Sequence, residues 1–206
     1  MRAFQSPEGR KPFHAQAQFF FVRQMSEIGR SMGSINDVKN SQLRRTAAIA
    51  LVALSVAALA LNAWYWTNLP NRIATHFNVR GRPDGWMDKT KATWLMVALQ
   101  LGLPWLLVGM GEVIRYLPTS LINIPRREYW LHTDRREASL AYIRSWIGWV
   151  AIAVLLFMMS IGHLTYVANV RGAPLNVIVF GSLLVLYLIG IMLLVVAMVR
   201  RFTVPP

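Results

Sequence analysis

Four long apolar runs constrain the fold of this chain more than any other feature of its sequence. They cover residues 47–66, 93–113, 146–167 and 176–199. A run of about 20 apolar residues is long enough to cross about 30 Å of hydrocarbon as an α-helix. A helix in a soluble bundle would carry a polar stripe every three or four residues, and the first and last runs have none. The runs therefore predict an all-α membrane protein with four transmembrane helices.

Basic residues are distributed unevenly between the segments that flank these runs. Residues 1–45 hold eight Lys and Arg, the 114–145 loop holds six, and two more follow the last run. The 67–92 loop holds five, and the 168–175 loop holds one. Positively charged segments of membrane proteins stay in the cytoplasm. We therefore expect both termini and the 114–145 loop to be cytoplasmic, and the other two loops to lie outside.

Composition narrows the chemistry that such a protein can perform. The chain has no cysteine, which excludes a disulfide framework, a thiolate nucleophile and a cysteine metal site. It also lacks a glycine-rich phosphate loop, paired catalytic carboxylates and a nucleophile–base pair. The sequence therefore does not support an enzyme and indicates no cofactor. The net charge of +13 follows the predicted topology, so it does not indicate a nucleic-acid partner.

The predicted membrane domain occupies residues 46–200 and has a segment on either side of it. Residues 1–45 are expected to form a basic, partly disordered cytoplasmic segment, in which Met25 and Met32 would each serve as a later start. Residues 201–206 are expected to form a short cytoplasmic tail.

The 67–92 loop contains a stretch with the two-residue period of a β-strand. Alternation of this kind predicts a strand with one face buried. A single hairpin is marginal in water, so we expect support from the helix ends, the 168–175 loop or another chain. The expected docking face holds Ile73, Thr75, Phe77 and Val79, and the opposite face holds Arg72, His76, Asn78 and Arg80.

Turn-forming residues follow this strand. Pro83, Asp84 and Gly85 are expected to form the turn. The segment from Trp86 to Asp88 would return as a short second arm, before Asp88 or Thr90 caps the next helix. The loop is therefore predicted to form a small extracytoplasmic β-hairpin cap on the helices.

Polar side chains inside the apolar runs gather near the outer end of the bundle. Helix geometry places Asn62, Gln100 and His163 in the outer half, below the loop that carries His76. One interpretation is an outward-facing pocket, roofed by the hairpin, for a peptide, lipid headgroup or small ligand. The favoured interpretation is plain hydrogen bonding between helices, because groups near the headgroups reach water. A zinc site has little support from spacing; its ligands would be His76, His163 and Asp84 or Asp88.

Glu112 is the only acidic residue inside a predicted span, and it lies at the cytoplasmic end. The favoured interpretation is an ion pair with Arg115, three residues further along the helix. A proton or cation site at Glu112 would instead favour a small transporter.

The 114–145 loop is expected to be irregular at first and helical at its end. Pro118 and Pro125 disfavour a continuous helix through its first half. Asp134 followed by Glu137 predicts a capped helix start that continues into the third span. The arginines of the loop suit anionic lipid headgroups. The side chains expected to face lipid are Ile124, Tyr129, Trp130 and Leu131.

Two motifs in these loops resemble those of a bacterial membrane domain of unknown function. The outer motif has the pattern Leu-Pro-x-x-Ile-Pro-x-His-Phe-Asn-x-x-Gly-x-Pro-Asp-Gly-Trp, and this chain departs from it at Ala74. The matching residues are Leu69, Pro70, Ile73, His76, Phe77, Asn78, Gly81, Pro83, Asp84, Gly85 and Trp86. The second motif is an Asn-Ile-Pro-x-x-x-Tyr-Trp segment followed by paired arginines, here Pro125, Tyr129, Trp130, Arg135 and Arg136.

The same domain opens SdpI-like immunity and signalling proteins, which carry a further membrane domain that is not expected in this chain. The resemblance therefore implies a non-enzymatic protein of the bacterial inner membrane that senses or binds a ligand at its extracytoplasmic face. Partners would be the lipid bilayer, another membrane protein or a second copy of the chain, and a peptide or small-molecule ligand. The alternatives are a small transporter that uses Glu112 and a metal-dependent membrane hydrolase that uses His76.

Overall fold

Helices make up most of the described chain, which runs from residue 13 to residue 203 in this computed structural model. The elements are α1 (Phe13–Asn68), β1 (Arg72–Phe77), β2 (Pro83–Asp88), α2 (Lys89–Val113), η1 (Ile114–Tyr116), η2 (Thr119–Leu121), α3 (Arg127–Trp130), α4 (Arg136–Arg171) and α5 (Val177–Thr203). Residues 1–39 and 40–206 form two compact units. In the first unit, residues 13–39 are helical. Residues 1–12 and 204–206, parts of the predicted terminal segments, lie outside the described residues.

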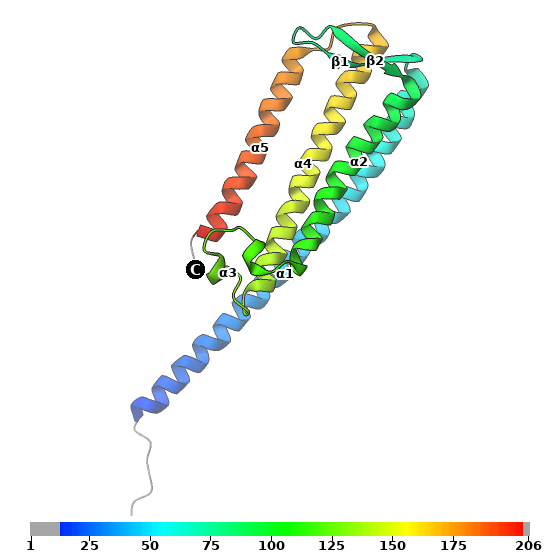
Figure 1. Cartoon of the computed structure of the whole chain (residues 1–206). Coiled ribbons are helices and arrows are strands. Elements are labelled where there is room, and N and C mark those ends of the chain that lie inside the picture. The colour runs from blue at the N-terminus through cyan, green and yellow to red at the C-terminus, as the bar shows by residue number, and fades with distance from the viewer. Residues whose placement is uncertain (1–12, 204–206) are drawn as a thin grey trace, which may run out of the picture. The chain divides into compact units, whose positions relative to one another are not determined.

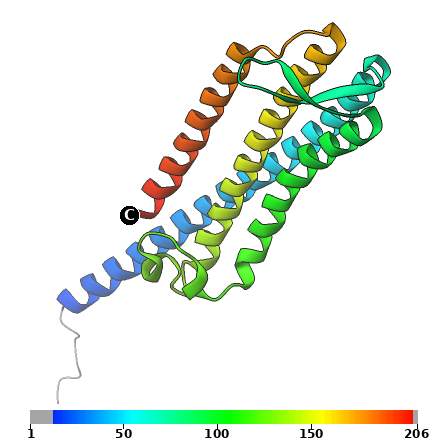
Figure 2. The same cartoon turned by 45° about the horizontal axis from the view of Figure 1, so that its top comes forward.

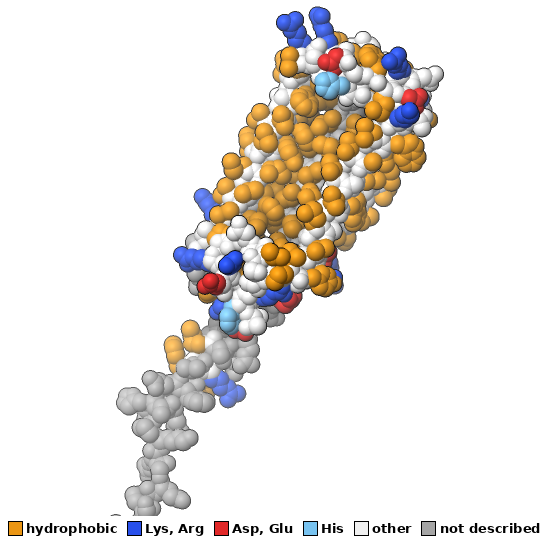
Figure 3. Space-filling view, in the orientation of Figure 1, with side chains coloured by type: hydrophobic (Ala, Val, Ile, Leu, Met, Phe, Trp, Pro, Cys, Tyr) orange, Lys and Arg blue, Asp and Glu red, His pale blue; other side chains and the backbone are white. Residues whose placement is uncertain are grey.

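Four helices of the described chain are long and apolar enough to cross a membrane, as the sequence predicts. The candidate spans are Ser41–Asn68, Lys89–Tyr116, Arg136–Arg171 and Val177–Thr203. Figure 3 shows hydrophobic side chains along the length of the second unit and charged side chains gathered toward its two ends. This distribution fits a multi-pass membrane protein, and it confirms the predicted fold class of four membrane helices with a small β-hairpin.

Helix α4 lies at the centre of the bundle, with α1 and α2 on one side and α5 on the other (Figure 1). A stacked ring pair, Phe157 and Tyr187, joins α4 to α5 with 4.4 Å between ring centroids. The Trp146 Nε1–H also donates to the Leu194 carbonyl at 2.8 Å. Small side chains let α1 and α4 approach closely. That seam is built from Ala47, Leu51, Ala58, Ala151, Ile152 and Leu155.

The segment between α2 and α4 folds back under the bundle and closes the end opposite the hairpin, here called the loop end (Figure 1). Ile124, Trp130 and Leu131 are buried, and Tyr129 packs partly buried beside them. The expectation that these four side chains face lipid is therefore wrong. The reason is that Phe202 of α5, together with α4, supplies an apolar surface onto which the irregular segment collapses.

Residues of the second motif hold this loop in place. The Trp130 Nε1–H donates to the Phe202 carbonyl at 2.8 Å, and the Arg135 guanidinium lies 4.3 Å from the centre of the Tyr129 ring. Arg136 Nη2 donates to the carbonyls of Arg115 and Leu117, at 3.2 and 2.9 Å. Pro125, half-buried, precedes the short helix α3.

Helix α4 starts differently from the prediction but continues as predicted. It begins at Arg136 without a side-chain cap, and Asp134 lies 3.4 Å from His132 Nδ1. The predicted capping by Asp134 is therefore wrong, because its carboxylate pairs with the imidazole of the preceding turn. The helix does run on without a break into the third span.

The outer loop forms the predicted antiparallel hairpin, but its turn lies earlier in the chain. Asn78 Oδ1 accepts the backbone N–H groups of Arg80 and Arg82, at 2.9 and 3.1 Å. Gly81 supplies the left-handed residue, with a φ of 75°. The predicted turn at residues 83–85 is therefore wrong, and those residues belong to β2. An asparagine side chain and one glycine complete the turn by themselves.

The alternation of β1 breaks at Thr75. Ala74 pairs with Trp86 and His76 pairs with Gly85, so Thr75 has no opposite residue and forms a bulge. Ile73 and Ala74 are consequently both buried, whereas Thr75 is exposed. The predicted docking face holds for Ile73 and the half-buried Phe77 but is wrong for Thr75 and for Val79, which is 94% exposed.

Candidate functional site

Helix α4 fastens the hairpin through one side chain, Asn169. Its Oδ1 accepts the Ala74 N–H at 2.7 Å, and its Nδ2 donates to the Ala74 carbonyl at 2.9 Å. Ala74 is only 2% exposed, so both backbone groups depend on this amide. Asn169 therefore supplies the donor and the acceptor that a neighbouring strand would offer to β1.

The hairpin tip is fastened to the segment that leads into α5. The Leu175 N–H donates to the Gly81 carbonyl at 2.8 Å. A Cβ at Gly81 would lie 2.2 Å from the Leu175 carbonyl oxygen, so only glycine permits this approach. Figure 2 shows the hairpin lying across the helix ends toward α5, which gives its outer surface a firm base.

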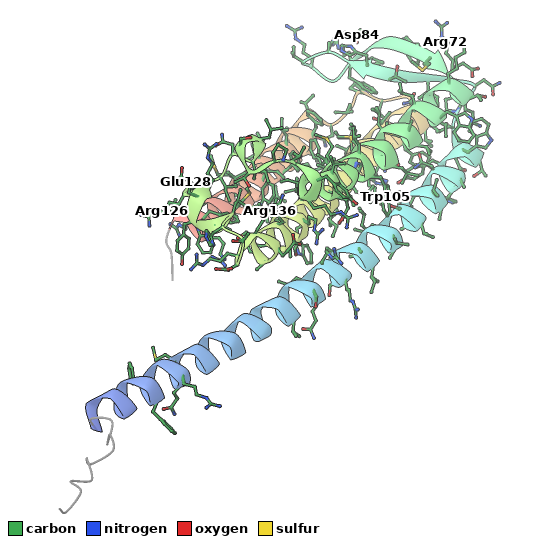
Figure 4. The ribbon with its side chains drawn as sticks, turned by 60° about the horizontal axis from the view of Figure 1, so that its bottom comes forward. Arg72, Asp84, Trp105, Arg126, Glu128 and Arg136 are labelled. Atoms are coloured by element: carbon green, nitrogen blue, oxygen red, sulfur yellow. The ribbon has the colours of Figure 1, made fainter. Side chains whose placement is uncertain are left out.

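Motif residues on that outer surface form an exposed pair. His76 Nδ1 lies 2.5 Å from Asp84 Oδ1 across the two strands, and these side chains are 75% and 44% exposed. A Cβ at Gly85 would lie 2.8 Å from the His76 Cβ, so the motif glycine makes room for the histidine. Trp86 follows, 51% exposed. Figure 4 shows Asp84 and Arg72 on the hairpin, at the end of the bundle opposite the loop end.

Two polar residues of the spans, Asn62 and Gln100, bond to each other beneath the hairpin. Asn62 Nδ2 donates to Gln100 Oε1 at 2.6 Å and to the Ala58 carbonyl at 2.7 Å. Gln100 Nε2 in turn donates to the Met158 carbonyl at 3.3 Å. Asn62 and Gln100 are both buried, and the bond between them supports the interpretation of plain hydrogen bonding between helices.

His163, expected in the same cluster, belongs to an aromatic group instead. Its Nδ1 shares a hydrogen bond of 2.9 Å with the Tyr65 hydroxyl. The Tyr65 ring stacks on Tyr166 with 4.1 Å between ring centroids. The expected placement of His76 above these polar groups is wrong, because β1 turns its imidazole toward Asp84 and the surface.

The cavity beneath the hairpin is small. Its volume is about 50 Å³, which is room for a few water molecules and too little for a peptide or a lipid headgroup. Thr93 lines it, and the Thr93 hydroxyl is buried without a hydrogen-bond partner within the described structure. A water molecule is the occupant that this volume and this hydroxyl suit.

Glu112 has partners other than the expected one. Its carboxylate oxygens lie 3.9 Å from Arg44 Nη1 and 3.5 Å from Arg144 Nη1. The predicted pair with Arg115 is not formed, because the helix tightens into η1 there and the Arg115 guanidinium turns 4.7 Å over the Tyr116 ring. Glu112 is thus shared between two cations from neighbouring helices.

The zinc set that combines His76, His163 and an aspartate is not assembled. Among the side chains that the structure describes, no three from His, Asp and Glu lie close enough together to hold a metal ion. Asp88 is engaged elsewhere, since it caps α2 by accepting the backbone N–H groups of Thr90 and Lys91. The predicted capping of α2 by Asp88 is confirmed.

Residues 53–101 match the model of a domain of unknown function, DUF1648. The matched stretch comprises the last part of α1, the hairpin and the first half of α2. It therefore contains the outer motif as well as the Asn62–Gln100 pair, and it assigns them no activity. No curated protein and no solved structure gives a significant match to the chain.

Two residues that shape the molecule could not be identified from the sequence pattern. Asn169 lies at the end of an apolar run, where a polar residue is ordinary, and nothing local indicates that it binds a strand 95 positions earlier. Arg144 belongs to the basic residues from which the topology is predicted, although its side chain is only 13% exposed. The only sequence feature that indicates burial of Arg144 is its position in the predicted helix that continues into the third span.

Proposed function

We propose that this chain is a non-enzymatic receptor of the bacterial inner membrane whose hairpin binds an acidic polypeptide segment on the extracytoplasmic side. The observation that carries the proposal is the placement of the outer motif. His76, Asp84 and Trp86 lie on the exposed surface of a firmly fastened hairpin. Beneath it, two side-chain hydrogen bonds engage polar groups of the spans, and the cavity there, lined in part by the Thr93 hydroxyl that is unpaired within the described chain, has a volume of about 50 Å³. A ligand would therefore meet the outside of the hairpin.

The charge of the hairpin region favours an acidic ligand. Residues 72–91 hold five basic and two acidic residues. Both acids are already engaged, Asp84 with His76 and Asp88 with the start of α2. At the tip, Arg80 and Arg82 follow the 94%-exposed Val79 closely in the chain. Arginines beside an exposed apolar side chain suit a segment that carries carboxylates and one apolar residue.

Two further observations support the orientation and the role. The excess of basic residues in the termini and the 114–145 loop favours a cytoplasmic place for them and an extracytoplasmic hairpin. The likeness of the outer motif to that of SdpI-like immunity and signalling proteins supports a receptor or partner role.

The two alternative functions have less support. A transporter would need Glu112 free to exchange a proton or cation, whereas Arg44 and Arg144 both lie within 4 Å of it. A metal hydrolase would need further ligands beside His76, and the described residues bring only Asp84 to it among the acids and histidines.

The test is site-specific photocrosslinking in native membranes. A photoreactive residue at Val79 is expected to give a discrete protein adduct, and a further Arg80→Gln or Arg82→Gln change is expected to reduce its yield, because either change removes a positive charge at the tip. The matched control carries the same photoreactive residue at Ile189 of α5, which is exposed on the apolar flank. Proteolysis of the adduct, followed by mass spectrometry of the peptide crosslinked to Val79, would show whether the crosslinked segment is acidic.

The proposal would be contradicted by the absence of a Val79 adduct, by an adduct whose yield is unchanged in both hairpin variants, and by an equal adduct at Ile189. An adduct of doubled mass that contains only this chain would assign the surface to self-association and would also exclude a separate acidic ligand.

A further inference from the structure

A second cavity lies near the loop end of the bundle, enclosed by α1, α2 and α4. Its volume is about 480 Å³, roughly ten times that of the cavity beneath the hairpin. Its apolar wall includes Leu51, Trp105 and Val108. Its charged side, nearer the loop end, carries four arginines and one acid: Arg44, Arg45, Arg115, Arg144 and Glu112.

Arg144 is the most buried of the four arginines. Its side chain is 13% exposed, compared with 48% for Arg44, and Arg45 and Arg115 are exposed residues. Its Nη1 lies 3.5 Å from Glu112, but its Nε is buried without a hydrogen-bond partner within the described structure. A buried donor on a charged group is costly to leave unpaired, which favours an acceptor in the cavity.

The balance of charge in the cavity favours an anion. Among the described residues that line the cavity, Glu112 is the one carboxylate, and it already lies between Arg44 and Arg144. The described lining therefore carries three more positive than negative charges, and attraction for an anion is strongest at the buried Arg144, because its surroundings are less polar than water. The planar guanidinium fork matches the oxygens of a phosphate group in particular.

The charged and the apolar parts of the lining lie at different positions along the helices. Arg44, Arg144 and Arg115 lie toward the loop end of their helices, and Leu51, Trp105 and Val108 lie further along the spans, where the acyl region of a bilayer would be. Trp105, labelled in Figure 4, is held against α1 by a hydrogen bond of 3.2 Å from its Nε1–H to Ser55 Oγ.

We propose that this cavity binds an anionic phospholipid, with the phosphate at the arginines and one acyl chain along the Leu51, Trp105 and Val108 wall. A charged head and an apolar tail in this order match the two-part lining. Basic pockets between membrane helices recognise anionic headgroups by the same physics. A free phosphate ion would use the arginines but not the apolar wall.

The test is native mass spectrometry of the full-length protein in mild detergent. The probes are phosphatidylglycerol and phosphatidylcholine with matched acyl chains. One phosphatidylglycerol molecule is expected to bind about tenfold or more tightly than phosphatidylcholine, the preference that about 1.4 kcal/mol gives. Arg144→Gln is expected to abolish the preference. Arg44→Gln, at a half-exposed position that leaves the buried packing intact, is expected to reduce it about threefold.

The matched control is Arg127→Gln, which removes an exposed arginine of α3 that is not part of the cavity lining. It is expected to leave the preference unchanged. Equal binding of the two lipids would overturn the proposal, as would equal losses in the Arg127 and Arg44 variants. Displacement of phosphatidylglycerol by millimolar inorganic phosphate would assign a soluble phosphate ligand and overturn the lipid assignment. The result is independent of the hairpin ligand and of the orientation in the membrane.

Discussion

Replacement of Asn169 by alanine is expected to release the hairpin from the bundle while the four spans stay intact. The asparagine amide makes both hydrogen bonds that join the Ala74 backbone to α4. Alanine at this position removes both partners at once. The Ala74 N–H and carbonyl would then be unpaired beneath a residue that is 2% exposed.

The magnitude follows from these two groups. An unpaired buried backbone group costs about 1–3 kcal/mol, so two of them would cost about 2–6 kcal/mol if the site stayed dry. Because the hairpin lies at the end of the bundle and water can enter once the strand lifts, about 2–4 kcal/mol is expected. That free energy corresponds to a local opening equilibrium shifted about 30- to 700-fold.

Hydrogen–deuterium exchange in lipid nanodiscs measures this opening directly. Peptides that contain residues 72–77 are expected to exchange faster in Asn169→Ala by that factor, with little change in the spans. Asn169→Asp keeps the acceptor for the Ala74 N–H and loses the donor, so it is expected to give an intermediate rate. The matched control is Asn68→Ala, because the exposed Asn68 bonds only within its own helix end among the described residues.

Equal exchange of residues 72–77 in the Asn169 and Asn68 variants would refute this reasoning. It would mean that the Ala74 groups find other partners, or that the hairpin is held mainly by its apolar contacts. Faster exchange across all four spans would also refute it, since the loss would then be global.

Three further substitutions test other contacts. Gly81→Ala is expected to destabilise the hairpin tip by more than 1 kcal/mol, because its Cβ would lie 2.2 Å from the Leu175 carbonyl oxygen and the φ of this residue is 75°. Hydrogen exchange of residues 78–82 is expected to become faster, and an unchanged rate would contradict the close approach. Trp130→Phe removes one buried hydrogen bond of 2.8 Å and is expected to cost about 1 kcal/mol, seen as a lower midpoint of thermal unfolding in detergent; an unchanged midpoint would contradict it. Gly162→Ala places a Cβ 2.6 Å from Gln100 Nε2 and is expected to lower the midpoint of thermal unfolding. The control Gly172→Ala, at a position with open space and a φ of 57°, is expected to lower it less.

The parts of the fold that follow a strict period are predictable from sequence. The apolar runs gave the four spans because burial in lipid requires an unbroken apolar surface. The alternation that includes Arg72 and Ile73 also predicts the hairpin. The bulge at Thr75 was not predictable, because a bulge is set by the fit of β1 against α4 and β2 rather than by the local pattern.

Contacts between distant segments were beyond the reach of sequence patterns. The burial of Trp130 depends on Phe202, 72 positions away, and an irregular apolar segment reads equally well as a lipid-facing one. Glu112 likewise finds Arg44 and Arg144 on other helices, whereas helix periodicity points only to Arg115. The motif could be located from sequence, but its exposed placement required the geometry of β1 and Gly85.

The most direct test of the central claim is the accessibility of the hairpin surface in intact cells. The chain has no cysteine, so a single Val79→Cys change gives one defined thiol. A membrane-impermeant maleimide is expected to label this thiol in intact cells, and to label a Leu121→Cys thiol at the exposed position in η2 only after permeabilisation. The opposite pattern, with Leu121→Cys labelled in intact cells and Val79→Cys protected until permeabilisation, would contradict an extracytoplasmic recognition surface.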